Sequence, residues 1–221
     1  MTSFISQPFS RVLDRLFNET SALDPSSSIF FSQLSQAEQQ RLMRSKTDYV
    51  DLYSALKHLP LAVSRETGML LYMLARSGKA KSIVEFGTSF GVSTLHLAAA
   101  LRDNGGGLLI TTEFEPSKVA RARSNLTEAG LIDLVEIREG DALDTLATNM
   151  PETIDLLLLD GAKALYPDIL ALLESRLRPG AFIIADNTEY SPEYLARMRC
   201  VANGYMSVAL ADDIELSMRL F

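Results

Sequence analysis

Short apolar runs alternate with segments of helical periodicity from about residue 81 onward, and no other feature narrows the possible folds as much. Several runs are apolar nearly throughout, which is typical of parallel strands that helices cover on both faces. Strands alternating with helices imply right-handed crossovers and a doubly wound parallel sheet. The pattern predicts five such strands, at Lys81–Phe86, Leu108–Glu113, Asp133–Arg138, Ile154–Asp160 and Ala181–Asp186.

The segments between these strands have helical periodicity, and Pro116 and Gly130 fit the first turn and the C-terminal stop of one helix. Two alternating runs end the chain, separated only by Asp212-Asp213, and this separation predicts a hairpin. One strand must therefore be antiparallel. The sequence predicts an α/β fold with a doubly wound, mostly parallel seven-stranded sheet and helices at Val92–Leu101, Pro116–Ala129, Leu143–Thr148, Tyr166–Leu177 and from Pro192 onward.

The chain before residue 81 has a helical pattern. Ser35–Glu38 is a capping box, and apolar residues follow at helical spacing as far as Leu56. A further helix is expected over Glu66–Ser77, and the serines at 26–28 indicate a loop. This region could pack against the sheet or a partner subunit, or it could roof the active site, and the sequence leaves both possibilities open.

Composition argues against several classes of partner. The net charge is −7 and no dense Lys/Arg run is present, so nucleic acid is not expected. The nearest candidate, Lys118–Arg123, is interpreted as the solvated face of a helix. Cys200 is the single cysteine. No apolar run approaches the length of a membrane span, and Met1–Ser10 lacks the pattern of a signal peptide. We expect a soluble cytoplasmic protein.

The segment Ser82–Thr94 combines a strand, a glycine loop and a helix start. Gly87 and Gly91 let a ligand approach the backbone and its free N–H groups. Their spacing differs from the G-x-G-x-x-G fingerprint of dinucleotide-binding folds. Glu85, just before the first glycine, suits a ligand that carries an ammonium group.

The same loop also fits G-x-S-x-G, the nucleophile elbow of α/β-hydrolases, with Ser89 as the nucleophile. That class needs a histidine later in the chain than the serine and the acid. The two histidines are His58 and His96, and none follows. A hydrolase is therefore not expected, and both histidines are interpreted as structural.

Polar residues stand at the carboxyl end of every predicted strand, where doubly wound sheets bind their ligands. Turns favour Asp and Asn, so one acid would mean little. A carboxylate at every strand end, with Gly140-Asp141 at the third, would line a site with oxygens able to hold ribose hydroxyls, an ammonium or a hard cation. These residues are Glu85, Glu113, Asp141, Asp160, Asp186 and Asn187.

Individual roles follow from position and chemistry. Glu113 ends the second strand, where nucleotide-binding folds hold a ribose diol, and Asp141 suits both a helix N-cap and an adenine contact. The oxygens of Asp160, Asp186 and Asn187 suit Mg²⁺ or Ca²⁺, whereas zinc has no His/Cys cluster to bind it.

Lys163 follows Asp160 by three residues. Most lysines keep their ammonium group in solvent, and a surface position is the simpler interpretation. Beside a divalent cation and partly desolvated, its pKa could instead fall far enough for it to act as a base.

Together these motifs resemble the class I S-adenosylmethionine-dependent methyltransferases, in particular the cation-dependent catechol and caffeoyl-CoA O-methyltransferases. The resemblance covers roughly residues 50–221. It is carried by Val84–Ser93, Ile110–Glu113, Gly140–Ala142, Asp155–Lys163 with Tyr166, and Leu177–Asn187.

The resemblance implies a Rossmann-like methyltransferase fold, with an S-adenosylmethionine-binding catalytic domain at 61–221 after a helical extension at 1–60 that serves as a cap or dimer contact. Glu113 would hold the ribose, and Asp141 and Ala142 would face the adenine. The methionine part would lie against Glu85, Gly87, Thr88, Ser89, Gly91 and Ser93, with Asp160 also in the cofactor site.

The resemblance further implies that Asp160, Asp186 and Asn187 hold a divalent cation (Mg²⁺, with Ca²⁺ or Mn²⁺ as alternatives) and that Lys163 is the general base. The cation would acidify and orient an acceptor hydroxyl, which would attack the methyl group. The expected acceptor is a small, catechol-like molecule, and the expected assembly is a homodimer without nucleic-acid or membrane partners.

Other possibilities stay open at this point. The chain could be a metal-independent N- or O-methyltransferase, or a non-catalytic protein that binds the cofactor. Aromatic and sulfur-containing side chains could line an acceptor pocket, although such residues more often belong to the core or an interface; they are Met43, Tyr49, Tyr53, Tyr166 and Tyr190.

Overall fold

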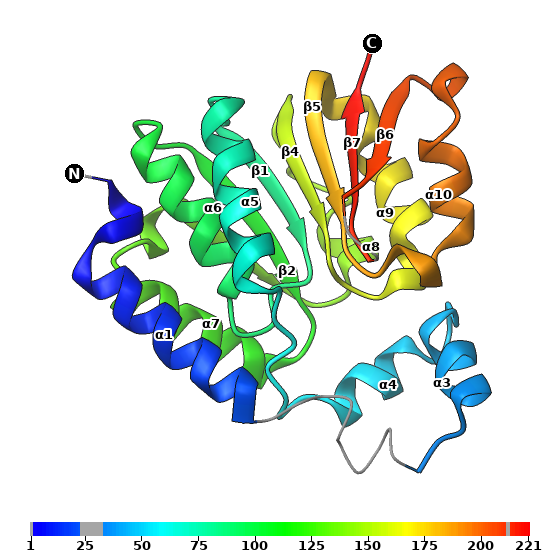
Figure 1. The fold of residues 1–221 in the computed structure, drawn as a ribbon, viewed down its shortest axis with the longest axis horizontal. Coiled ribbons are helices and arrows are strands. Elements are labelled where there is room, and N and C mark those ends of the chain that lie inside the picture. Colours follow the sequence, from blue (N-terminus) through cyan, green and yellow to red (C-terminus); the bar gives the residue numbers. More distant parts are fainter. Residues whose placement is uncertain (1, 23–32, 211–212) are drawn as a thin grey trace.

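The computed structural model describes residues 2–22, 33–210 and 213–221. Within these ranges, seven strands form one sheet in the order β3-β2-β1-β4-β5-β7-β6 (Figure 1). The strands are β1 (Ser82–Phe86), β2 (Leu108–Glu113), β3 (Val135–Glu139), β4 (Ile154–Leu159), β5 (Leu177–Ala185), β6 (Tyr205–Ala209) and β7 (Glu215–Arg219). The first five are parallel, and β7 is antiparallel to both β5 and β6, which confirms the predicted sheet.

Helices cover both faces of the sheet, and each face encloses its own apolar cluster (Figure 1). On one face lie α1 (Gln7–Ala22), α5 (Arg65–Ser77), α6 (Val92–Asp103) and α7 (Pro116–Glu128). On the other lie α8 (Ala142–Thr145), α9 (Tyr166–Leu173) and α10 (Pro192–Met198). Short 3₁₀ helices occupy Ser3–Ile5, Ile132–Leu134, Lys163–Leu165, Glu174–Arg176, Thr188–Tyr190 and Val201–Asn203.

Four predicted bounds were wrong for local reasons. α9 ends at Leu173 and not at Leu177, because residues 174–176 form a 3₁₀ turn that leads into β5. β3 begins at Val135 because the three preceding residues form a 3₁₀ turn. β5 begins at Leu177, since a register shift against β4 accommodates the Pro179-Gly180 pair that breaks its apolar pattern. α8 ends at Thr145, and the guanidinium of Arg138 binds the carbonyl of that residue and others just beyond.

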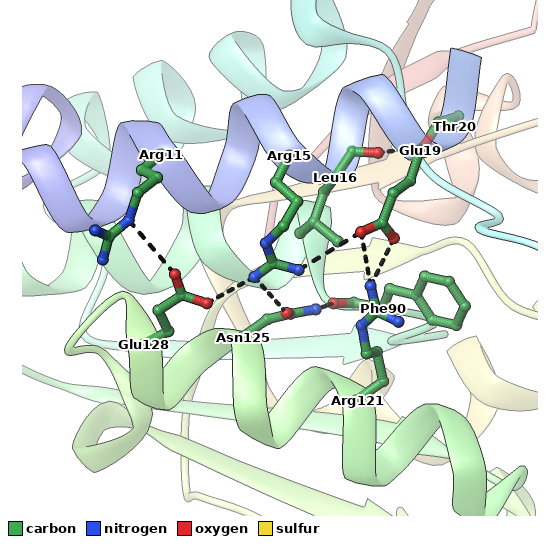
Figure 2. A network of polar contacts seen from close by, with 9 residues as sticks. All are labelled: Arg11, Arg15, Leu16, Glu19, Thr20, Phe90, Arg121, Asn125 and Glu128. Carbon is green, nitrogen blue, oxygen red and sulfur yellow. Dashed lines mark hydrogen bonds and ion pairs between the residues drawn. The ribbon is translucent and has the colours of Figure 1, made fainter. Parts of the chain in front are cut away.

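α1 was not among the predicted helices, and it belongs to the core. Its face of Phe9, Val12, Leu13 and Leu16 is buried against α5, α6 and α7. Figure 2 shows the opposite side of this contact, where Arg11, Arg15 and Glu19 of α1 form ion pairs with Glu128 and Arg121 of α7. Exposed pairs contribute little individually, so apolar burial is what holds α1 in place.

Two short helices, α3 (Gln36–Met43) and α4 (Tyr49–Ala55), lie beyond the edge at which the parallel strands end (Figure 1). The predicted capping box is confirmed, because the Ser35 hydroxyl accepts from Glu38 N–H and the Glu38 carboxylate accepts from Ser35 N–H. The predicted loop at 26–28 lies outside the described residues. No helix in the described ranges is long and apolar enough to cross a bilayer.

The interpretation of Lys118–Arg123 as a solvated face was wrong at its start. Lys118 is 3% exposed and Val119 and Ala122 are also buried, whereas Arg123 faces solvent. The helical period places Lys118, Ala122 and Asn125 on the side of α7 that meets the sheet and the glycine loop.

Candidate active site

The loop after β1 turns sharply against the end of β4. Gly87 has a φ of +103°, and a Cβ there would lie 2.6 Å from the carbonyl oxygen of Asp160. Gly91 has a φ of +88° at the N-cap of α6. Only glycine permits this combination of a left-handed backbone and close approach.

Glu85 lies beneath this loop and is completely buried. Its carboxylate accepts hydrogen bonds from the hydroxyls of Ser93 at 2.5 Å and of Thr94 and Thr111 at 2.6 Å. Burial raises the pKa of Glu85 to about 7, against the lowering effect of these bonds. Glu85 lines neither cavity described below, so the structure shows it joining β1, β2 and α6, and its contact with the cofactor stays a prediction.

A cavity of about 340 Å³ opens above the loop, at the ends of β1, β2 and β3. Six of the predicted cofactor residues line it: Gly87, Ser89, Glu113, Asp141, Ala142 and Asp160. Thr88 and Ser93 are instead buried behind it, where the Thr88 hydroxyl donates to the carbonyl of Thr112. Gly91 is buried at the start of α6.

Two of the three acids that line this cavity are held by backbone N–H groups. Glu113 accepts from Ser89 N–H at 2.9 Å and from Glu115 N–H at 3.0 Å. Burial raises the pKa of Glu113, and these bonds oppose the shift. Asp141 caps α8 by accepting from Leu143 N–H at 2.8 Å, which confirms the predicted N-cap.

Asp141 also accepts a hydrogen bond from the Tyr49 hydroxyl at 2.6 Å. Burial and this bond raise the pKa of Tyr49 to about 12, so the hydroxyl remains a donor. Tyr53, one helical turn later, also lines the cavity, and its hydroxyl lies 3.4 Å from the carbonyl oxygen of Gly161. α4 thus roofs the cavity, one of the two roles that the sequence left open.

Beside this cavity, the ends of β4 and β5 bring together a lysine and two acids. The ammonium of Lys163 donates to Asp160 Oδ1 at 2.8 Å and lies 3.8 Å from Asp186 Oδ2. Burial and the charge of Asp160 raise the pKa of Asp186 to about 7. Burial lowers the pKa of Lys163, as expected, but the two carboxylates outweigh it and the pKa lies well above its ordinary value.

A second, larger cavity of about 770 Å³ contains this cluster. Asp160, Lys163, Asp186 and Asn187 all line it, and Asp160 is also in the wall of the first cavity. Met43 and Tyr53 belong to its wall, whereas Tyr166 is buried in the core and donates its hydroxyl proton to the backbone carbonyl of Asp186 at 2.7 Å. Tyr190 lines neither cavity.

The donor set fits a hard cation. Two neighbouring carboxylates, Asp160 and Asp186, share one ammonium group, and the Asn187 amide adds a neutral oxygen. The described residues contain no group of three or more His, Cys, Asp or Glu side chains placed to hold a metal ion, so this candidate site has only two carboxylates and an amide. Metal binding by Asp160, Asp186 and Asn187 stays a prediction.

Sequence analysis missed Lys118 and Phe114, which also line the first cavity. Phe114 directly follows the strand-end acid Glu113, a position that could have marked it. Lys118 gave no such signal, because a lysine among arginines on a helix is normally exposed.

Comparison with known proteins finds similarity to methyltransferases. Residues 84–188 match the family model of a methyltransferase domain. The chain is 38% identical over 130 residues to a catechol O-methyltransferase of Niastella koreensis, covering 58% of each chain. A catechol O-methyltransferase of Mycobacterium tuberculosis is 36% identical over 127 residues, covering 58% of this chain and 57% of that protein.

Over these segments the chain is similar to methyltransferases, including two proteins named catechol O-methyltransferase. The crystal structure of the O-methyltransferase TomG from Streptomyces achromogenes with S-adenosylmethionine superposes with a TM-score of 0.65 at 26% identity, covering 92% of this chain and 99% of TomG. The sequence alignments span less than two thirds of either catechol O-methyltransferase. The similarity includes the glycine loop and the ends of the parallel strands.

Proposed function

We propose that this methyltransferase moves a methyl group from S-adenosylmethionine to a hydroxyl of a small, catechol-like aromatic acceptor. The observation that carries the proposal is the position of Asp160, which lines both the cavity with Glu113 and Asp141 and the cavity with Lys163 and Asp186. Two reactants bound in these cavities would meet at Asp160. The printed names of the two relatives support a catechol-like acceptor.

In the first cavity, Glu113 accepts the hydroxyl protons of the ribose, and Asp141 and Ala142 lie against the adenine. The carboxylate of Asp160 suits the ammonium of the methionine part, and Gly87 and Ser89 line the same cavity. Holding both reactants in attack geometry can lower the barrier by roughly 7–11 kcal/mol. Positioning is therefore the main task of this half of the site.

In the second cavity, Asp160, Asp186 and Asn187 hold a divalent cation, for which we propose Mg²⁺. When bound, the cation lowers the pKa of an acceptor hydroxyl and offsets the negative charge of the two acids. Lys163 then loses the carboxylate charge that keeps its pKa high, while burial continues to lower that pKa. Lys163 can thus take the acceptor proton at its Nζ atom.

The test is transfer of labelled methyl from S-adenosylmethionine to a panel of catechols, with Mg²⁺ and with EDTA. We expect turnover that requires the cation and falls by at least about 100-fold in Lys163→Met, the size of a typical general-base contribution. Turnover that EDTA does not affect would remove the metal role and leave a metal-independent methyltransferase. Cofactor binding without any methyl transfer would support the non-catalytic alternative. The homodimer and the cytoplasmic location stay predictions.

A further inference from the structure

Lys118 is a buried lysine for which the mechanism above has no role. It lies in the first turn of α7, is 3% exposed and lines the same cavity as Glu113. Within the described residues its ammonium has no hydrogen bond and no carboxylate oxygen within 4.0 Å, and its contact is with the Phe90 ring, whose centroid is 6.0 Å away. A buried ammonium normally has a direct partner.

Local structure does not explain the lysine. A positive charge in the first turn opposes the helix dipole, which favours acids at that end. Burial lowers the pKa of Lys118, and only the more distant charges of Glu113 and Glu115 raise it. A methionine would fill this space without an electrostatic cost, so the ammonium itself needs a reason.

Several contacts fix the part of the cavity wall that contains Lys118. Figure 2 shows the amide of Asn125 donating to the carbonyl of Phe90 at 2.8 Å and the guanidinium of Arg121 beside the Phe90 ring, 5.2 Å from its centroid. Arg121 is in turn paired with Glu19 of α1. Because the start of α7 and the glycine loop are joined in this way, Lys118 and Glu113 face the cavity from fixed positions.

We propose that Lys118 is a cofactor-binding residue that donates a hydrogen bond to a ribose hydroxyl oxygen of S-adenosylmethionine, opposite Glu113. This inference rests on the proposed binding of that cofactor. A ribose diol has protons to give and lone pairs to receive: Glu113 takes the protons, and Lys118 supplies a donor to the oxygens. Two oxygens of Glu113 already accept backbone N–H groups, so each keeps a lone pair for a hydroxyl.

The first experiment measures the affinity for S-adenosylhomocysteine by calorimetry and the free energy of unfolding of the ligand-free protein. We expect Lys118→Met to bind roughly tenfold or more weakly, the worth of a hydrogen bond to a charged group. The same variant should be as stable as wild type or more stable, because an unpaired buried charge is gone. Arg123→Met, on the solvated face of the same helix, is the control and should change neither quantity.

The second experiment repeats the titrations with the 2′-deoxy and 3′-deoxy forms of S-adenosylhomocysteine. If Lys118 binds one hydroxyl, wild type should lose at least about fivefold more affinity on deletion of that hydroxyl than Lys118→Met does. Equal losses for both proteins, or unchanged binding in Lys118→Met, would overturn the role of Lys118 while leaving the methyltransferase proposal intact. Failure of the wild type to bind S-adenosylhomocysteine would instead overturn both.

Discussion

Glu85 and Asp186 are both buried acids near the ends of parallel strands, and the pKa of each is raised to about 7, but the causes differ. Around Glu85, three hydroxyl groups donate to the carboxylate and lower its pKa, whereas burial, with a smaller effect of the charge of Asp160, raises it. Around Asp186, a second carboxylate adds to the effect of burial, and the nearest ammonium stands 3.8 Å away. The first environment is complete within the protein, whereas the second has more negative than positive charge.

From this difference we predict a structural role for one acid and a ligand-binding role for the other. An acid whose acceptors are filled by its own protein holds elements together, as Glu85 does for β1, β2 and α6. An acid left beside another acid gains from a cation, and Asp186 and Asp160 line the larger cavity where one can enter. A raised pKa alone would not distinguish the two cases, since it is shared.

The largest loss of stability is expected at Gly87, where the loop after β1 touches the backbone that follows β4. Gly87→Ala combines a disfavoured positive φ with a Cβ 2.6 Å from the Asp160 backbone, and should cost roughly 2–5 kcal/mol and abolish binding of S-adenosylhomocysteine. Gly106→Ala is the matched control, with a φ of +93° and no atom within 4 Å of the new Cβ. Similar free energies of unfolding for the two variants would show that the loop after β1 and the backbone after β4 are not in close contact.

The pH dependence of stability tests whether Glu85 is protonated in the fold. The pKa of Glu85 is about 7 in the folded protein and 4.5 in an unperturbed glutamate. Folding therefore favours the protonated form. The stability that protonation supplies is present below pH 4.5 and lost as pH rises through 7, by on the order of 3 kcal/mol. Glu85→Gln should remove this decline, and Glu66→Gln, on the exposed side of α5, should not.

His96 gives the opposite slope and would mask that of Glu85 in the wild type. Burial lowers its pKa from 6.5 to about 4, so the stability of the neutral form is present above pH 6.5 and lost as pH falls through 4. In Glu85→Gln, stability should therefore rise from pH 4 to 6.5, as measured by urea unfolding. A flat profile in that variant would contradict the lowered pKa of His96. His58→Asn, at an exposed histidine, is the control.

Substitution of Asp186 is expected to have a smaller effect on the stability of the fold and a large effect on metal binding. Asp186→Asn removes like-charge repulsion and should leave the free energy of unfolding unchanged or slightly higher. Affinity for Mn²⁺, followed by calorimetry, should fall more than about tenfold. Asp168→Asn removes an acid that pairs with Lys46 at the surface and should leave Mn²⁺ binding as it is. Equal Mn²⁺ affinity in Asp186→Asn and wild type would mean that Asp186 is structural, like Glu85.

Much of the fold could be predicted because parallel strands and amphipathic helices leave strong periodic signals. The hairpin of β6 and β7 followed from the short separation between two alternating runs. α1 was missed although Phe9, Val12 and Leu13 have helical spacing, because its stability comes from burial against elements more than forty residues away along the chain. Local pattern cannot report such a partner.

The site was predictable to the same extent. Residues at strand ends were found because the parallel sheet brings those ends to one edge, and Asp160, Lys163 and Asp186 do meet there. The roles of Tyr49 and Lys118 could not be found, since each depends on packing between distant segments. Three nearby hydroxyls donate to Glu85, which the sequence did not indicate, and the contact of Glu85 with the cofactor stays a prediction.

The smallest effect is expected for the ion pairs between α1 and α7, in which opposite charges pair at the surface (Figure 2). Arg11 pairs with Glu128 at 3.5 Å, but its side chain is 71% exposed, so solvent screens the attraction. Arg11→Met should change the free energy of unfolding by less than about 0.5 kcal/mol and leave S-adenosylhomocysteine binding unchanged. Leu16→Ala, in the buried face of the same helix, should cost about 2–5 kcal/mol by comparison. If the two variants lost similar stability, charge rather than apolar burial would hold α1, and the exposed pairs would then belong with Glu85 as structural contacts.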